Sequence, residues 1–143
     1  MNDGANRMRL KNAIIHCSAT PEGRDVDIED IRQFHLNRGW RDVGYHFVIK
    51  LDGTIQEGRA LFTQGAHARG YNSPSNVGIC YVGGLDKDKN PKDTRTEAQK
   101  DAMLDLLSDL KRENPEMYIM GHRDTGAPKA CPCFEAKELN EQV

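Results

Sequence analysis

Apolar residues along this chain gather in short runs that polar turns separate, and the composition of most runs is typical of strands. The runs are rich in β-branched and aromatic residues, and glycine, proline, serine or asparagine lies at or near their ends. They predict strands over residues 12–17, 45–51, 77–82 and 117–120. Asp52-Gly53 follows the second run at once and is a strong turn signal, so residues 54–58 are predicted to return antiparallel as a hairpin.

Two longer segments have helical periodicity instead. Over residues 27–38, apolar positions recur three or four apart, acidic residues crowd the start as the helix dipole favours, and a glycine follows. Over residues 96–113, Thr96 and Gln99 fit a capping box ahead of an apolar stripe. A further short helix is predicted over 134–142. Because strands alternate with helices and one hairpin is present, the predicted fold class is α/β, with a central mixed β-sheet flanked by helices.

Size and composition indicate a single globular domain. The chain has 143 residues, of which 37% are hydrophobic and 29% are charged. A chain of that length can bury one core without disulfides. We expect a flexible N-terminal leader over residues 1–10, followed by one folded domain over residues 11–143.

Charge and hydropathy argue against several classes of partner. The formal net charge is −2, and Lys and Arg form no block or stripe, so we expect no nucleic-acid partner. No apolar run approaches the roughly 18 residues of a membrane span, and the N-terminus lacks the apolar stretch of a signal peptide. We therefore expect a protein that is cytoplasmic as made, has no membrane partner and works as a monomer.

Histidine and cysteine side chains, which are natural ligands of zinc, occur at predicted strand ends and in a rigid loop. A catalytic zinc site takes three protein ligands and leaves one position open. His16 lies at the end of the first predicted strand, His122 follows the last one, and Cys131 lies in a loop stiffened by Pro128 and Pro132. Spacing alone leaves an alternative open, because a lone histidine at a strand end is more often an ordinary hydrogen-bonded residue and a lone cysteine a small buried apolar one.

Seven motifs occur in order through residues 12–135 and cover most of the chain. They include Gly-Ala-His-Ala-Arg-Gly-Tyr-Asn, Gly-His-Arg-Asp and Ala-Pro-Lys-Ala-Cys-Pro, and the positions of all seven are 14–20, 39–49, 52–59, 65–72, 77–84, 121–124 and 127–132. Each motif is modest by itself, but seven in this order are specific. Together they closely resemble the type-2 N-acetylmuramoyl-L-alanine amidases, a family that includes short phage lysozymes of the amidase type and the peptidoglycan recognition proteins of animals.

The resemblance implies a fold like that of the amidases and peptidoglycan recognition proteins, with a zinc site at one end of the sheet. It implies one zinc ion (Zn2+) per chain, held by His16, His122 and Cys131, and catalytic roles for Tyr45 and Lys129. The implied reaction is hydrolysis of the amide bond between the lactyl group of N-acetylmuramic acid and the L-alanine of peptidoglycan. Peptidoglycan or a soluble muropeptide is then the binding partner.

Two parts of the resemblance leave alternatives open. Some branches of the family carry a glutamate as general base where this chain has Cys80. Proton removal then falls to Tyr45, to solvent or to the acidity of the metal alone. In the motif at 65–72, His67, Arg69 and Asn72 could line the substrate groove; alternatively, His67 and Asn72 only shape a loop.

The resemblance favours a phage or prophage lysis enzyme, made in the host cytoplasm and acting on the cell wall after release through a holin. The alternatives are a cytoplasmic amidase that recycles muropeptides, a non-catalytic peptidoglycan-binding module, and a cysteine amidase that uses Cys17 or Cys131 with a histidine. Non-catalytic relatives typically lose the cysteine ligand, whereas this chain keeps Cys131 together with Tyr45 and Lys129, which favours an enzyme.

Overall fold

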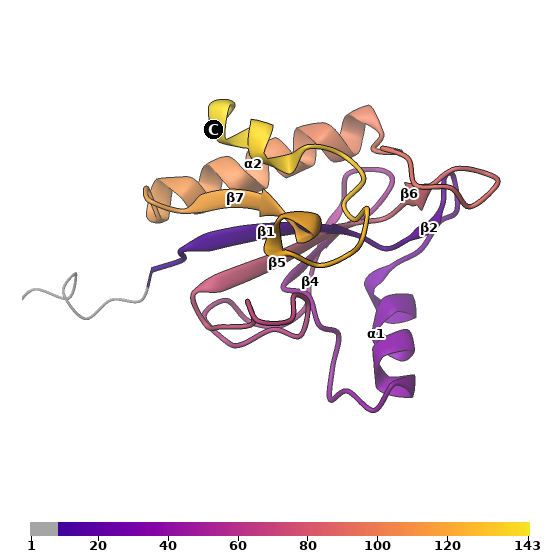
Figure 1. Cartoon of the computed structure of the whole chain (residues 1–143), viewed down its shortest axis with the longest axis horizontal. Coiled ribbons are helices and arrows are strands. Elements are labelled where there is room, and N and C mark those ends of the chain that lie inside the picture. Colours follow the sequence, from indigo (N-terminus) through magenta and orange to yellow (C-terminus); the bar gives the residue numbers. More distant parts are fainter. Residues whose placement is uncertain (1–8) are drawn as a thin grey trace, which may run out of the picture.

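The computed structural model describes residues 9–143, and a five-stranded mixed sheet forms its centre (Figure 1). The strands are β1 (Asn12–Cys17), β3 (Phe47–Ile49), β4 (Ile55–Glu57), β5 (Asn76–Tyr81) and β7 (Tyr118–Gly121), in the order β4-β3-β5-β1-β7. β1 is parallel to both of its neighbours, β5 and β7, and β3 is parallel to β5. β4 returns antiparallel beside β3, so the predicted hairpin and the mixed sheet are confirmed.

Helices cover the sheet on both faces, and the alternation of side chains along each strand assigns residues to one face or the other. α2 (Glu97–Glu113) and a 3-10 helix (Ala136–Glu141) pack against Ile15 and Tyr81, where the larger hydrophobic core lies. α1 (Ile28–Asn37) packs on the opposite face. Figure 1 shows α2 and the C-terminal turn on one side of the sheet and α1 on the other.

The face under α1 is the one that carries His16. His16 of β1 is paired with Cys80 of β5, and Cys80 is paired with Val48 of β3, so these three side chains share a face of the sheet. Cys80 and Val48 pack in the smaller core together with residues of α1. The last residues of β1 therefore present a histidine beside the helix that is shorter and less extensively packed, where room remains for a cavity.

The predicted elements agree with the observed ones to within two residues at each end, and only the last helix differs in type, being 3-10 rather than α. The strands β2 (Thr20–Pro21) and β6 (Gly84–Leu85) form a second parallel sheet that was not predicted. A strand of two residues is too short for an alternating pattern to reveal it, and its pairing depends on a segment distant in sequence.

The leader expected over residues 1–10 lies mostly outside the described residues, which begin at residue 9. Leu10 is 2% exposed, packs in the larger core, and donates its backbone N–H to Oδ1 of Asn114 at 2.8 Å. The folded region therefore includes Leu10. Across residues 9–143, no helix combines the length and the apolar character that crossing a membrane requires.

Gln99 joins the start of α2 to the ends of two strands. Its backbone N–H and side chain form the predicted capping box with Thr96. Its Nε2 also donates to the carbonyl oxygens of Ile49 at 3.1 Å and Val82 at 3.0 Å. Because Gln99 is fully buried, water cannot replace these bonds if the side chain is removed.

We predict that Gln99→Ala lowers the free energy of unfolding by about 1–3 kcal/mol, because it leaves the buried carbonyl group of Val82 without its side-chain donor and the backbone N–H of Thr96 without its acceptor. Urea unfolding monitored by circular dichroism measures the change. Gln33→Ala on the exposed side of α1 is the matched control, with an expected change within about 0.5 kcal/mol. Equal effects of the two substitutions would contradict the role given to Gln99.

Candidate metal centre and active site

The three predicted zinc ligands meet at one edge of the sheet. β1 and β7 are parallel and in register, so His16 and His122, at and just beyond their ends, lie side by side. Their ring centroids are 4.6 Å apart. Cys131 comes from the loop that follows, where its Sγ accepts a hydrogen bond from the backbone N–H of Cys17 at 3.2 Å. The tertiary structure thus brings together side chains that are more than a hundred residues apart in the sequence.

The donor set fits a metal ion. One ligand atom from each of His16, His122 and Cys131 lies within 4.8 Å of the other two. Imidazole nitrogen and thiolate sulfur are donors that zinc prefers, and three protein ligands leave a catalytic zinc ion its open position. His16 is buried and the other two are half-buried, so the cluster is accessible from one side.

The side chain of His67 is hydrogen-bonded to that of His16. Nε2 of His16 lies 2.9 Å from Nδ1 of His67, which is a hydrogen-bond distance. The His67 side chain borders a cavity beside the cluster, but it is only 8% exposed. Its Nε2 is buried and has no hydrogen-bond partner within residues 9–143. Such an unpaired buried group costs about 1–3 kcal/mol and calls for a functional explanation.

The other two residues expected at the substrate groove have different surroundings. Oδ1 of Asn72 accepts hydrogen bonds from the backbone N–H groups of His67 at 2.9 Å and Ala68 at 3.0 Å. These two hydrogen bonds hold the loop in its conformation. Arg69 is exposed, and both Arg69 and Asn72 line the same cavity of about 680 Å³.

Burial keeps the histidines of this cluster neutral. It lowers the pKa of His16, and the neighbouring His67 and His122 lower it further. Burial also lowers the pKa of His67, to about 3. For His122, burial and then the positive charge of Lys129 lower the pKa. Neutral imidazole is the form that binds a metal ion, so the surroundings favour ligation near neutral pH.

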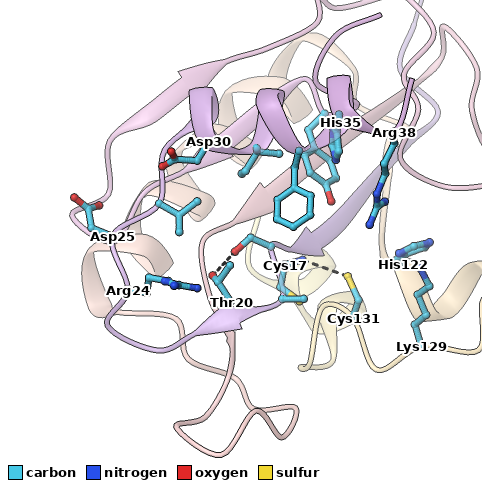
Figure 2. Close-up of a pocket in the computed structure, with 16 residues that line it drawn as sticks. Cys17, Thr20, Arg24, Asp25, Asp30, His35, Arg38, His122, Lys129 and Cys131 are labelled. Carbon is cyan, nitrogen blue, oxygen red and sulfur yellow. Dashed lines mark hydrogen bonds between the residues drawn. The ribbon is translucent and has the colours of Figure 1, made fainter. Parts of the chain in front are cut away.

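Tyr45 and Lys129 lie at a cavity that two of the three candidate ligands, His122 and Cys131, also line. This cavity measures about 540 Å³ and extends beneath α1. Figure 2 shows Cys131, His122 and Lys129 along one wall of this cavity, with α1 across from them. The Tyr45 ring centroid is 5.0 Å from that of His16. Burial raises the pKa of Tyr45, so its hydroxyl is a hydrogen-bond donor at neutral pH.

Arg38 is a residue that the sequence did not single out. It lines both the cavity under α1 and the one beside Trp40 and Arg69, and Figure 2 shows its side chain directed toward His122. Its guanidinium lies 5.9 Å from the centroid of the Phe34 ring and equally far from that of Trp40. The sequence signal that could have pointed to Arg38 is its spacing of four residues from Phe34, which places both side chains on one side of the end of α1.

Cys80 offers no substitute for a carboxylate base. Its side chain is fully buried next to His16 on the sheet, and burial raises the pKa of its thiol well above the usual value. The thiol also contacts the Tyr45 side chain. A neutral buried thiol neither removes a proton from water nor carries a charge, so Cys80 acts here as a packing residue.

Together, the mixed sheet and the cluster of two histidines and one cysteine at its edge are typical of a metal-dependent hydrolase. The family model described as N-acetylmuramoyl-L-alanine amidase matches residues 6–134. The chain therefore belongs to the N-acetylmuramoyl-L-alanine amidase family, and both the family and the enzyme class expected from the sequence motifs are confirmed.

Individual relatives agree with this assignment. The chain is 46% identical over 140 residues to an endolysin of Klebsiella phage KP32, covering 96% of this chain and 91% of the endolysin. Among solved structures, N-acetylmuramoyl-L-alanine amidase LysC from Clostridium intestinale URNW is 26% identical with a TM-score of 0.79, covering 94% of this chain and 85% of LysC. A mutant of Drosophila PGRP-LB in complex with tracheal cytotoxin is 29% identical with a TM-score of 0.75, covering 88% of this chain and 76% of that protein.

His35 forms part of the wall beside the centre. It is 7% exposed, its Nδ1 accepts the backbone N–H of Gly44 at 2.8 Å, and its ring centroid is 4.3 Å from that of Trp40. Burial, followed by the positive charges of Arg38 and Arg59, lowers the pKa of His35 to about 4. Between that value and the ordinary 6.5, the unfolded chain binds a proton at this position and the folded chain does not.

We predict that the metal-free protein loses stability as the pH falls from about 6.5 toward about 4, because the unfolded state takes up this proton. His35→Asn keeps an acceptor for Gly44 but cannot titrate, so its free energy of unfolding should fall less over the same interval. Urea unfolding of both proteins at about pH 7 and about pH 5 measures the difference. Identical pH dependence would show that His35 titrates normally in the folded protein.

Proposed function

We propose that this protein is a zinc-dependent N-acetylmuramoyl-L-alanine amidase in which His16, His122 and Cys131 hold one zinc ion. The observation that carries the proposal is the convergence of these three donors at the edge of the sheet, with Tyr45 and Lys129 at the same cavity. The bond hydrolysed is the amide between the lactyl group of N-acetylmuramic acid and L-alanine in peptidoglycan.

The metal and the residues around it have separate tasks. Zinc at such a site supplies Lewis-acid chemistry, which polarises a carbonyl group and makes water more acidic. Lys129 is exposed at the rim and close enough for its charge to lower the pKa of His122. An ammonium group in that place can stabilise the negative charge that develops on the oxygen of the scissile amide.

Tyr45 lines the same cavity and is a hydrogen-bond donor there. Its ring contacts the ring of His16, and its hydroxyl remains protonated at neutral pH. It can therefore bind the attacking water or the same developing oxyanion. Cys80 is neutral and buried, so it cannot act as the base. Within the described residues, the ligand cluster also contains no carboxylate. This chain therefore offers no carboxylate base in that cluster, and proton removal from the water would fall to solvent or to the acidity that a bound zinc ion would confer.

The two cavities on either side of His122 and Lys129 suit an extended substrate. The cavity under α1 measures about 540 Å³ and the one beside Trp40 about 680 Å³, and Arg38, His122 and Lys129 line both. We assign the peptide and sugar portions of peptidoglycan to this pair of cavities. Arg69 and Asn72 are the proposed substrate contacts in the second one, with His67 at its border.

The biological role proposed is lysis of a bacterial host from a phage or prophage. The 46% identity to an endolysin over most of both chains supports this role. We expect synthesis in the cytoplasm and action on the cell wall after release. A cytoplasmic recycling amidase would instead prefer soluble muropeptides, and a non-catalytic binding module would bind the wall without cleaving it.

Product analysis distinguishes these roles. Purified protein is incubated with whole sacculi and with defined muropeptides, and the products are identified by mass spectrometry. We expect free stem peptides beginning with L-alanine, released from sacculi as well as from fragments. Cleavage of fragments alone would favour recycling, and binding to sacculi without any released peptide would refute the catalytic proposal.

We predict that His122→Ala abolishes both stoichiometric zinc binding and amidase activity, because two remaining ligands hold zinc poorly. Metal analysis of the purified variant and release of stem peptides measure the two effects. In the wild-type protein, a chelator should remove activity and added zinc should restore it. Activity that survives the chelator but not a thiol alkylator would support a cysteine amidase instead.

We predict that Lys129→Ala retains one zinc ion per chain but slows hydrolysis by about 10²–10³-fold, the loss typical of one oxyanion donor. Lys87→Ala, in the charged loop before α2, is the matched control for removal of a surface lysine. The test compares kcat on a defined muropeptide for the two variants. An unchanged kcat for Lys129→Ala would remove this residue from the catalytic machinery.

A further inference from the structure

Two glycines make room for the ring of His67. A Cβ atom at Gly78 would lie 2.6 Å from Cγ and Cδ2 of His67, and one at Gly65 would lie 2.5 Å from its Cδ2. Both distances are far below a normal contact, so a larger residue at either position would displace the ring. The backbone N–H of His67 is fixed in turn by Asn72. The fold therefore holds this imidazole in one place between a strand and a loop.

The hydrogen bonds of the neighbouring His46 show what a structural histidine looks like in this protein. Nδ1 of His46 accepts the backbone N–H of Gly78 at 3.0 Å, and its Nε2 lies 2.9 Å from the carbonyl oxygen of Thr63. Both ring nitrogens of His46 thus bind the backbone. Within residues 9–143, the ring nitrogens of His67 make one hydrogen bond, and its partner is the side chain of His16 rather than the backbone. The buried polar ring of His67 therefore serves His16 rather than the backbone.

We infer that His67 is a positioning residue for the centre: its Nδ1 accepts the Nε2–H of His16, which leaves Nδ1 of His16 free as the metal ligand. The inference rests on the zinc site proposed above and deepens it. No part of this role requires His67 to touch the substrate.

A single proton lies between the rings of His16 and His67. Two neutral imidazoles at hydrogen-bond distance share one proton, and it belongs either to Nε2 of His16 or to Nδ1 of His67. In the first case, Nδ1 of His16 carries a lone pair and can bind a metal ion. In the second case, Nδ1 of His16 carries the proton and cannot. An acceptor at the position of Nδ1 of His67 therefore selects the tautomer that ligation needs.

The direction of this bond also assigns the proton of the neutral His67 ring to its unpaired nitrogen. When Nδ1 of His67 is the acceptor, its own proton lies on Nε2, which has no partner among the described residues. In this assignment the Nε2–H of His67 is an unsatisfied buried donor, and the function of the ring depends on Nδ1, which accepts the hydrogen bond from His16. Ligating histidines generally donate their second N–H to a carboxylate, a carbonyl or water, and here an imidazole takes that place.

Two substitutions at His67 test whether zinc binding requires an acceptor at the position of Nδ1 or only a polar side chain at this place. The side-chain oxygen of His67→Asn lies close to where Nδ1 was, whereas that of His67→Gln reaches the position of Nε2. Zinc dissociation constants of the metal-free proteins are measured by competition with a chromophoric chelator. We expect His67→Asn to bind zinc nearly as tightly as the wild type, and His67→Gln to bind it about 10–100-fold more weakly.

Controls distinguish positioning from loss of structure. The metal-free melting temperatures of the two variants are compared. Asn114→Ala alters a buried polar residue next to Leu10, at the opposite end of β1 from His16, and should leave the zinc dissociation constant unchanged. If His67→Gln does not fold, His67→Ala takes its place with the same expected loss of affinity.

Two results would overturn the inference: wild-type zinc affinity in His67→Gln or its replacement, or a loss in His67→Asn as large as that in His67→Gln. A wild-type protein that takes up no zinc would overturn the proposed metal site itself, and the inference with it. Stoichiometric zinc in the wild type together with tight binding in every variant would remove only the role given to His67.

Discussion

Parallel pairing of β1 with both β5 and β7 is the constraint on which the rest of the site depends. Because parallel strands end at the same edge, β1 and β7 deliver His16 and His122 side by side, with ring centroids 4.6 Å apart. The same pairing of β1 with β5 puts Cys80 beside His16 and closes that face with apolar packing. Cys131 is then held against the end of β1 by a bond from the backbone N–H of Cys17 to its sulfur. The metal centre is thus a consequence of strand register together with one loop.

Burial is the second determinant of the site, and it acts in opposite directions on different groups. It lowers the pKa of His16 and His67, which keeps both rings neutral, and it raises the pKa of Tyr45 and Cys80, which keeps both protonated. The interior of the centre therefore carries little charge of its own. Positive charge comes from the rim, where Lys129 lines the cavities from a loop and Arg38 from the residue that follows α1. This division suits a reaction in which negative charge develops on the substrate and must be met by groups that do not need to be buried.

Sequence pattern predicted most of the architecture because the signals are local. The capping box at Thr96 and Gln99 and the turn at Asp52-Gly53 depend on residues within one or two turns of chain, and both are found as predicted. The two-residue strands β2 and β6 were missed because their pairing joins distant segments and has no local pattern. The burial of Leu10 was missed for the same reason, since its partners include Asn114.

For the site, the sequence by itself determined the kinds of donor available and, through ordered motifs, the family and the residues expected to act. It could not decide their arrangement, because the proximity of His16, His122 and Cys131 depends on the register of β1 and β7 and on a loop folded back onto Cys17. Nor could it decide that His67 faces His16 rather than open solvent. That orientation exists because Gly65 and Gly78 leave space for the ring from two segments that meet only in the folded protein, and the hydrogen bond to His16 is a property of that meeting.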